Sequence, residues 1–172
     1  RVALELMRNR QLLASALVLR NVSGDVEAAF ELYEKNILLG EDLHSDNPDS
    51  IERIQALARS ADDLAELLFV RDPTDRNGRV EQLHQLSLEL SQRQYSLNAL
   101  PRIAENLSIS YYNLFRYYTH TDKNELARKH AEAFLSTVSA LLEVGQRISP
   151  DLESAYRQLY PYFPDDSSET SN

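Results

Sequence analysis

The fold of this chain is decided by the stretch IERIQALARSADDLAELLFV, residues 51–70, because its apolar positions recur about fifty residues earlier and fifty residues later. The recurring positions are spaced by three, seven and three residues, which places them on one face of an α-helix. Repeats of this length are typical of stacked helical hairpins. A hairpin cannot bury its apolar face alone, so neighbouring hairpins must cover it, and the sequence predicts a solenoid. The recurring sets are Leu4, Ile54 and Ala104; Met7, Leu57 and Leu107; Ala14, Leu64 and Leu114; and Leu17, Leu67 and Tyr117.

The composition predicts an all-α chain. Leu, Ala, Glu and Arg are abundant among the 172 residues, only 4 Gly are present, and β-branched residues are sparse in the periodic segments. These residue types favour helices. We expect a single domain over residues 1–163, which is long enough for a substantial core.

Charge and cysteine content exclude several classes of partner. The formal net charge is -9, from 18 basic and 27 acidic side chains, so most of the surface repels phosphate backbones and anionic lipid. We therefore expect neither nucleic acid nor membrane as a partner, and no stretch approaches the ~20 apolar residues of a membrane span. The absence of cysteine removes disulfides and thiolate metal sites and suits a reducing compartment, so we expect a cytoplasmic location.

The repeat divides the chain into three hairpins and a cap. We expect hairpins at about residues 1–48, 49–98 and 99–148, and a capping helix over residues 149–163 that covers the end of the array. Residues 164–172 are acidic and rich in Ser and Thr, and residues 165–172 carry no apolar side chain, so we expect a disordered tail. The chain begins without an initiator Met, and we expect it to be part of a larger polypeptide.

Turn residues set the expected helix ends. In the first hairpin Gly24 is expected to supply the turn and Asp25 to cap the second helix. A linker is expected from Gly40 to Asn47. The expected helices cover about residues 2–19, 26–39, 50–70, 79–97, 101–120, 124–147 and 152–160.

The loop of the second hairpin contains Asp75, Asn77 and Gly78, which echo the middle of an EF-hand calcium loop. The first ligand position would then be Pro73 and the twelfth His84, so the leading Asp and the two-oxygen Glu are missing. We expect instead a turn held by hydrogen bonds between side chains and backbone.

No pattern of catalytic or metal-binding residues stands out. The 4 His lie in different segments, without the paired spacing and acidic third ligand of a zinc helix. No Gly-rich phosphate loop, nucleophile elbow or Ser-His-Asp arrangement can be picked out, and a carboxylate pair such as Asp62 and Asp63 is ordinary on a helix surface. We therefore expect no enzyme activity, no cofactor and no metal.

Two segments resemble the tetratricopeptide repeat family. Residues 24–35, GDVEAAFELYEK, fit the second half of the family's hairpin pattern, with its Gly-Asp turn, small residues and Tyr. Residues 113–118, NLFRYY, followed by Asp122, Ala127 and Ala131, fit a whole hairpin. The period is longer than the standard repeat of about thirty-four residues. In this respect the chain is similar to arrays of kinesin-light-chain type and of large bacterial regulators.

The resemblance covers roughly residues 1–163 and implies a right-handed α-α superhelix of helical hairpins. The chain departs from the pattern at Phe115, where the family prefers a small residue, and at Leu83, which replaces an expected Ala. Small side chains at Ala29 and Ala127 let two helices approach closely, and large rings fill the wider space between helices. These rings belong to Tyr33, Tyr117 and Tyr118.

In this family the first helix of each hairpin lines the concave face, so the resemblance implies a groove that binds a protein segment. The candidate contacts are Arg59, Asp62, Glu66, Ile109, Tyr112 and Arg116. We expect Tyr112 and Arg116 to lie near Asp62 and Glu66 across the boundary between repeats. The mixed charges of these residues favour a polar partner.

The expected function is therefore a non-enzymatic protein-protein interaction module, a scaffold that binds a peptide or helix in its concave groove. Two alternatives remain open. One is a ligand- or peptide-sensing regulatory domain coupled to an effector domain outside this chain. The other is a self-assembly module that forms a homodimer.

Overall fold

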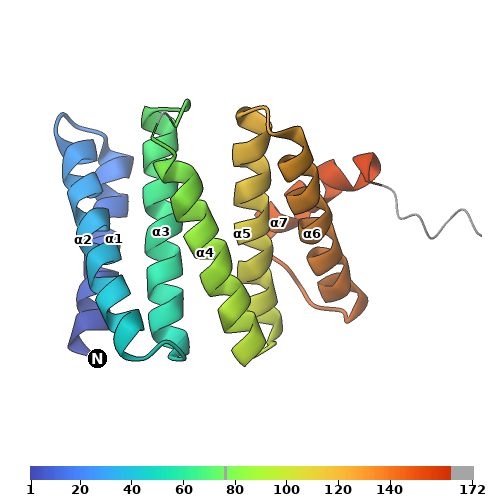
Figure 1. Cartoon of the computed structure of the whole chain (residues 1–172), viewed down its shortest axis with the longest axis horizontal. Helices are drawn as coiled ribbons and strands as arrows, with labels where there is room; N and C mark the ends of the chain where they lie inside the picture. Colours follow the sequence, from blue (N-terminus) through green and yellow to red (C-terminus); the bar gives the residue numbers. More distant parts are fainter. Residues whose placement is uncertain (76, 164–172) are drawn as a thin grey trace, which may run out of the picture. The chain divides into compact units, whose positions relative to one another are not determined.

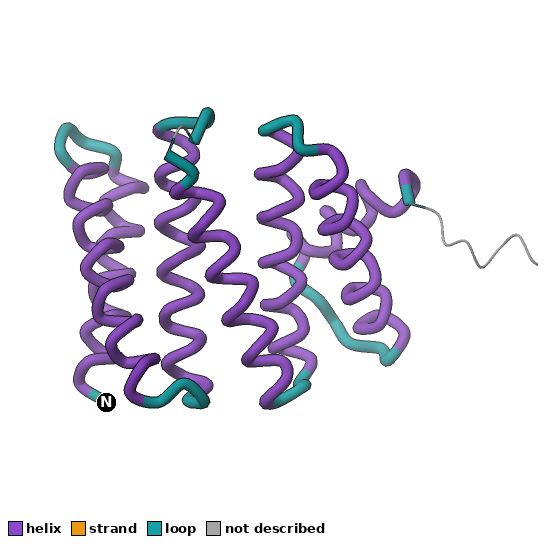
Figure 2. The backbone as a smooth tube through the Cα atoms, in the orientation of Figure 1, coloured by secondary structure: helices purple, strands orange, loops and turns teal. Residues whose placement is uncertain are grey.

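The computed structural model describes residues 1–75 and 77–163, and over these residues the chain is all-α (Figures 1 and 2). The predicted fold class is thus confirmed at the level of helices without strands. The tail predicted for residues 164–172 lies outside the described residues, as does Arg76 of the loop in the second hairpin. The helices are α1 (Val2–Arg20), α2 (Asp25–Asp46), α3 (Ile51–Arg71), α4 (Arg79–Leu97), α5 (Pro101–His120), α6 (Asn124–Glu143) and α7 (Pro150–Leu159), followed by the short 3₁₀ helix η1 (Tyr160–Tyr162).

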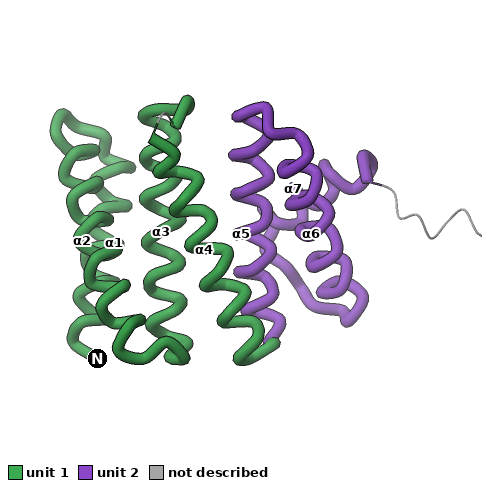
Figure 3. Tube along the Cα trace, viewed as in Figure 1, with its two compact units in different colours: residues 1–99 green, residues 100–172 purple. Residues whose placement is uncertain are grey.

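The chain forms two compact units, which Figure 3 colours separately. Unit 1 covers residues 1–99 and holds α1 to α4; unit 2 begins at Leu100 and holds α5, α6, α7 and η1. In unit 1, α1 packs on α2, α2 on α3 and α3 on α4, with a smaller contact between α1 and α3. In unit 2, α5 packs on α6 and α6 on α7. This packing of consecutive helices fits a helical solenoid.

The recurring apolar positions form the cores of the two units. In unit 1 the residues Met7, Ala14, Leu57 and Leu64 are buried. In unit 2 the corresponding Leu107 and Leu114 are buried. The small residues expected at close helix approaches and the rings expected beside them are buried too. These residues are Ala29, Ala127, Tyr33, Tyr117 and Tyr118. The remaining recurring positions of α5 are buried as well, and Ile54 of α3 is buried, whereas Leu4, Leu17 and Leu67 are half buried.

The turn between α1 and α2 differs in detail from the prediction. Gly24, not Asp25, occupies the N-cap position of α2, and Asp25 is the first helical residue. The Asp25 carboxylate accepts hydrogen bonds from Arg20 Nε at 2.8 Å and from the backbone N–H of Val22 at 2.9 Å. These hydrogen bonds lower the pKa of Asp25 to about 2, and the bond from Arg20 has the larger effect. Asp25 therefore closes the turn itself and does not cap the helix that follows.

Gly40 does not begin a linker, because α2 continues through it to Asp46. The residue is buried where α2 passes both α1 and α3, and a Cβ atom there would lie 2.8 Å from Leu57 Cδ1 and 3.0 Å from Met7 Cε. Glycine thus fits close packing at this point and does not mark a chain reversal. The helix ends at Asp46, before Asn47, whose conformation is restricted by Pro48.

Two further loops show how the helices end and begin. The predicted last helix of the third hairpin stops at Glu143 and not at Arg147, because Gly145 adopts a left-handed backbone with φ of 73°. Before α4, the Asp75 carboxylate accepts hydrogen bonds from the backbone N–H groups of Val80 and Glu81 at 3.0 and 3.1 Å. The prediction of a turn held by side-chain-to-backbone hydrogen bonds is confirmed there.

The predicted terminal helix packs within unit 2 as α7. Its Leu152 and Ala155 join a buried cluster with Phe134, Leu135 and Val138 of α6. Half-buried side chains from α5 and from the end of the chain surround this cluster, namely Tyr111, Tyr112, Ile148, Tyr156, Leu159 and Phe163. Across the part of the chain that the structure describes, no helix combines the length and the apolar composition that a membrane span needs.

Because Gly40 lies against Met7 and Leu57, the Gly40→Leu variant should destabilise unit 1 by about 1 to 3 kcal/mol through overpacking, although leucine is the better helix former. The free energy of unfolding from urea titrations measures this effect. Glu41→Leu, at the exposed neighbouring position, is the control and should change stability by less than about 0.5 kcal/mol. A Gly40→Leu variant as stable as the parent would contradict the close approach.

Candidate functional site

Three of the predicted contact residues lie on α3 of unit 1. Arg59 is exposed, whereas Asp62 and Glu66 are half buried. Asp62 is held by the second helix of its own hairpin: Ser87 Oγ donates a hydrogen bond to Asp62 Oδ2 at 2.8 Å, and His84 Nδ1 lies 3.5 Å from Asp62 Oδ1. The carboxylate therefore links α3 to α4 in addition to any contact it makes with a partner.

The neighbouring Asp63, which the sequence analysis considered an ordinary surface carboxylate, makes a contact between hairpins in unit 1. Its Oδ2 accepts a hydrogen bond from Gln11 Nε2 of α1 at 2.6 Å, which joins the first helices of two hairpins. Burial raises the pKa of Asp63; the Gln11 hydrogen bond opposes this effect, and the charges of Asp62 and Glu66 add to it. A comparison of the repeats could have singled out Asp63, because the fifty-residue period aligns this carboxylate with the apolar Leu13.

The other three predicted residues lie on α5 of unit 2. Ile109 and Arg116 are exposed, whereas Tyr112 is half buried. The Tyr112 ring lies 5.2 Å from the Phe134 ring of α6 and 6.0 Å from the Phe115 ring, measured between centroids. Tyr112 therefore contributes to the contacts of the unit 2 core. The expectation that Tyr112 and Arg116 approach Asp62 and Glu66 joins residues of different units and stays a prediction.

A second group of rings surrounds His130 on α6. The His130 ring stacks on Tyr118 at 5.4 Å between centroids and lies 6.1 Å from Tyr111. Burial, with a smaller contribution from Lys129, lowers the pKa of His130. On the other side of Tyr118, Lys123 Nζ lies 5.5 Å from the ring centroid. These contacts show that the dense aromatic run of α5 packs mostly within unit 2.

Unit 2 carries a groove of about 950 Å³ that was not predicted from the sequence. Its floor is a stripe along the whole of α6, one wall is the end of α5, and the other wall is η1 with Phe163. Seven lining residues are apolar or aromatic and seven are polar. They are Phe115, Thr119, Asn124, Ala127, Arg128, Glu132, Leu135, Ser136, Ser139, Ala140, Glu143, Tyr160, Tyr162 and Phe163.

The second wall of the groove is fixed by contacts between α6 and α7. The hydroxyl groups of Ser139 and Tyr156 lie 2.9 Å apart in a hydrogen bond, and the Tyr156 ring lies 5.3 Å from that of Tyr160. Beyond them Tyr162 is 79% exposed, which is unusual for an aromatic side chain that lines a groove. The Tyr160 ring, which is 42% exposed and packs on Tyr156, is available to a ligand at little cost in rotamer entropy.

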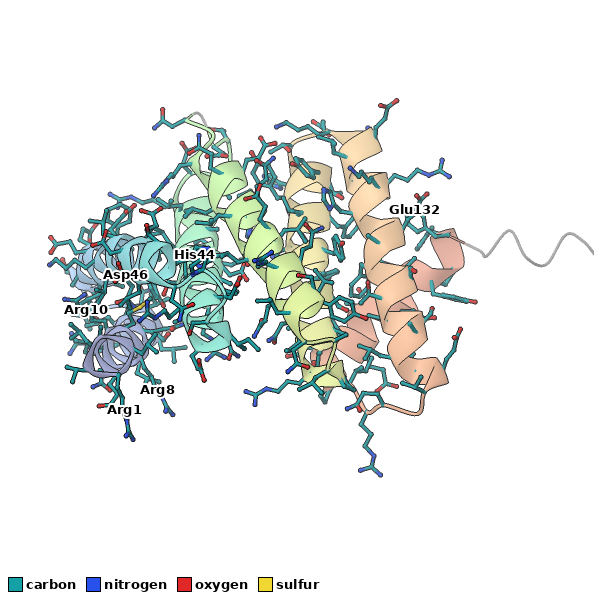
Figure 4. All side chains as sticks on the ribbon, turned by 60° about the horizontal axis from the view of Figure 1, so that its bottom comes forward. Arg1, Arg8, Arg10, His44, Asp46 and Glu132 are labelled. Atoms are coloured by element: carbon teal, nitrogen blue, oxygen red, sulfur yellow. The ribbon has the colours of Figure 1, made fainter. Side chains whose placement is uncertain are left out.

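The charges along the groove are sparse and mostly negative. Arg128 Nε donates a hydrogen bond to Glu132 Oε1 at 2.7 Å, so the two side chains neutralise each other on the surface of α6. Figure 4 shows Glu132 projecting from α6. Glu143 at the end of the helix is exposed. The groove therefore favours a ligand that brings a cationic group toward the Glu143 end.

The sequence has no recognised relatives among the known proteins with which it was compared. No protein-family model matches the sequence, and a search of curated proteins found no match. Among residues 1–75 and 77–163, no group of three or more His, Cys, Asp and Glu side chains is placed to hold a metal ion.

The raised pKa of Asp63 leads to a prediction on the pH dependence of stability. Because the folded state binds the proton more tightly than the unfolded state, ionisation of Asp63 costs stability as the pH rises above the ordinary value of 3.8. The Asp63→Asn variant keeps an oxygen acceptor for Gln11 and should be more stable than the parent at about pH 7, with the difference vanishing at about pH 3.

Urea unfolding at both pH values measures this difference. Glu52→Gln removes a charge from the exposed first turn of the same helix and serves as the control. Lower stability of Asp63→Asn at neutral pH would mean that the charged form is favoured in the folded chain, contrary to the sign argued above.

Proposed function

We propose that this chain is a non-enzymatic protein-interaction module whose unit 2 binds a helix of a partner protein in the groove along α6. The observation that carries the proposal is the groove itself, because it combines exposed aromatic rings with a continuous helical floor. Aromatic side chains in held positions contribute much of the energy of protein recognition. A surface of this kind serves binding without any chemical step.

A helix suits this groove better than an extended strand does. The groove follows α6, whose 20 residues span about 30 Å. A strand pairs best with a free sheet edge, and the described residues contain only helices, whose backbone groups are already bonded within the helix. A helical ligand satisfies its own backbone and presents only side chains to the walls. The proposed partner is therefore an amphipathic helix.

The small residues on the floor set the shape of this ligand. Ser136 and Ala140 leave room for large side chains from the partner, which would lie between Phe115 on one wall and Tyr162 on the other. Glu143 would attract a basic residue at one end of the bound helix. The proposed ligand thus carries a stripe of large apolar residues and a cationic end.

We further propose that the chain belongs to the tetratricopeptide repeat family, forms that family's superhelix and acts in the cytoplasm as part of a larger protein. The packing of consecutive helices and the burial of Ala29, Tyr33 and Ala127 support the family assignment. The absence of cysteine supports the location. On this assignment Arg59 of unit 1 and Arg116 of unit 2 are each a candidate contact for a protein segment.

The Ser136→Trp variant tests the groove, because a large ring on its floor should block a helical ligand. The probe is a fluorescent amphipathic helical peptide, selected from a displayed library against the parent chain and measured by fluorescence anisotropy. We expect binding to weaken at least about tenfold, or about 1.4 kcal/mol, while the melting temperature stays nearly unchanged. Lys129→Trp introduces the same ring at an exposed position of α6 outside the groove and should leave binding unchanged.

Equal binding by the parent and Ser136→Trp would eliminate the groove along α6. In that case the variant with Arg59→Ala and Arg116→Ala decides whether the predicted concave residues bind the peptide instead. Failure of the library to yield any peptide that binds the parent would count against helix recognition as a whole.

A further inference from the structure

The ring of His130 is enclosed at the end of unit 2 where α5 turns into α6. The residue is only 8% exposed and stands in the second turn of α6. Its ring stacks on Tyr118, in the last turn of α5, at 5.4 Å between centroids, and lies 6.1 Å from the Tyr111 ring. The histidine is therefore part of the contact that holds the end of α5 on the start of α6.

The Nδ1 atom of His130 is buried and has no hydrogen-bond partner among the described residues. A neutral imidazole tolerates this position when its proton is on Nε2, because Nδ1 is then only an acceptor. In the charged imidazolium both nitrogens are donors, so protonation leaves a buried N–H without an acceptor. The geometry therefore disfavours the charged form.

The charged groups around His130 do not offset this cost. Lys129 precedes it on α6, and Lys123 Nζ lies 5.5 Å from the centroid of the Tyr118 ring on which His130 stacks. No carboxylate of the described residues forms an ion pair with His130. Helix α7 packs on α6 from Phe134 onward, and its Glu153 and Arg157 pair with each other. The titratable side chains of α5 that face the ring are Tyr111 and Tyr118.

Acid must weaken the contact between α5 and α6. Burial lowers the pKa of His130 below its ordinary value of 6.5, and the charge of Lys129 lowers it further. Well above this value the imidazole is neutral in the folded and the unfolded chain alike. As the pH falls through 6.5, the unfolded chain takes up the proton first, so the free energy of unfolding decreases.

The same turn forms one end of the groove along α6. Thr119, which follows Tyr118 directly, lines the groove from α5. Asn124 and Ala127, which precede His130 by less than two helical turns, line it from α6. A movement of α6 away from α5 at His130 therefore displaces the two sides of this end of the groove relative to each other.

We propose that His130 is a pH-sensitive switch of the groove, an inference that rests on the binding function proposed above. The neutral ring holds α5 and α6 together and keeps the groove in its binding shape. The protonated ring leaves the Tyr118 ring and separates the two helices at their turn. The partner helix is then bound at neutral pH and released in acid. Because coupling between two sites is reciprocal, the bound partner also opposes protonation of His130.

NMR titration of the histidine rings tests the switch on the unmodified chain. We expect the titration midpoint of His130 to lie below that of the exposed His120. Saturation with the selected amphipathic peptide, in a version without histidine, should lower the midpoint of His130 further and leave that of His120 unchanged. Equal midpoints in the free chain overturn the switch. A midpoint of His130 that the bound peptide does not move overturns its link to the groove.

The His130→Phe variant keeps a ring beside Tyr118 but cannot take up a proton, and His120→Phe is the matched control at an exposed position. Acidification from about pH 7.5 to about pH 5.5 should raise the unfolding equilibrium constant of the parent and of the control by up to about tenfold more than that of His130→Phe. Urea titrations measure this difference, and circular dichroism confirms that each chain is folded. Equal responses of all three chains overturn the proposal.

Fluorescence anisotropy with the same peptide separates the switch from the groove. Acidification should weaken binding to the parent and to His120→Phe more than binding to His130→Phe. Equal weakening in all three chains counts against the switch alone, because the peptide still binds at neutral pH. Absence of binding at neutral pH counts against the groove itself.

Discussion

The structure depends on one constraint, which is that no helix of this chain can bury its apolar face without a neighbour. Most of the recurring positions of α1, α3 and α5 are buried, because the second helix of each hairpin packs on the first. The same requirement explains Gly40, where α2 approaches α1 and α3 so closely that a side chain would collide. It also explains α7, whose Leu152 and Ala155 cover apolar side chains of α6. Burial between neighbours decides where side chains may be large, where they must be small and which surfaces stay open.

The sequence predicted those features that depend on local periodicity. Helix positions and the buried residues of each face follow from spacing alone, because the same side of a helix returns every three or four residues. Gly40 was misjudged because glycine commonly ends a helix, and its true cause is a tertiary contact with Leu57 that no local pattern records. The position of Asp25 was wrong by one residue for a similar reason, because its carboxylate bonds to Arg20 at the end of the preceding helix, and the sequence does not show this contact.

The candidate sites too were predictable only where they depend on local sequence. The six residues inferred from family resemblance lie on the predicted helices, but Asp62 also binds α4 and Tyr112 also packs in the core, and these contacts come from other segments of the chain. The groove along α6 could not be read from the sequence, because its walls combine Phe115 with Tyr162, residues that lie far apart in the chain. Asp63 was visible only by comparing repeats, where a carboxylate stands at the position of Leu13.

The hydroxyl pair of Ser139 and Tyr156 couples the groove to α7, the shortest α-helix of the described residues. With only 10 residues, α7 is too short to be stable alone and is held by a few buried side chains and this hydrogen bond. Local opening of α7 removes the wall formed by Tyr160 and Tyr162 while α5 and α6 stay paired. A ligand that binds only the closed groove must then slow amide hydrogen exchange in α7 more than in α5, so the occupied site would be reported by residues that the ligand never touches.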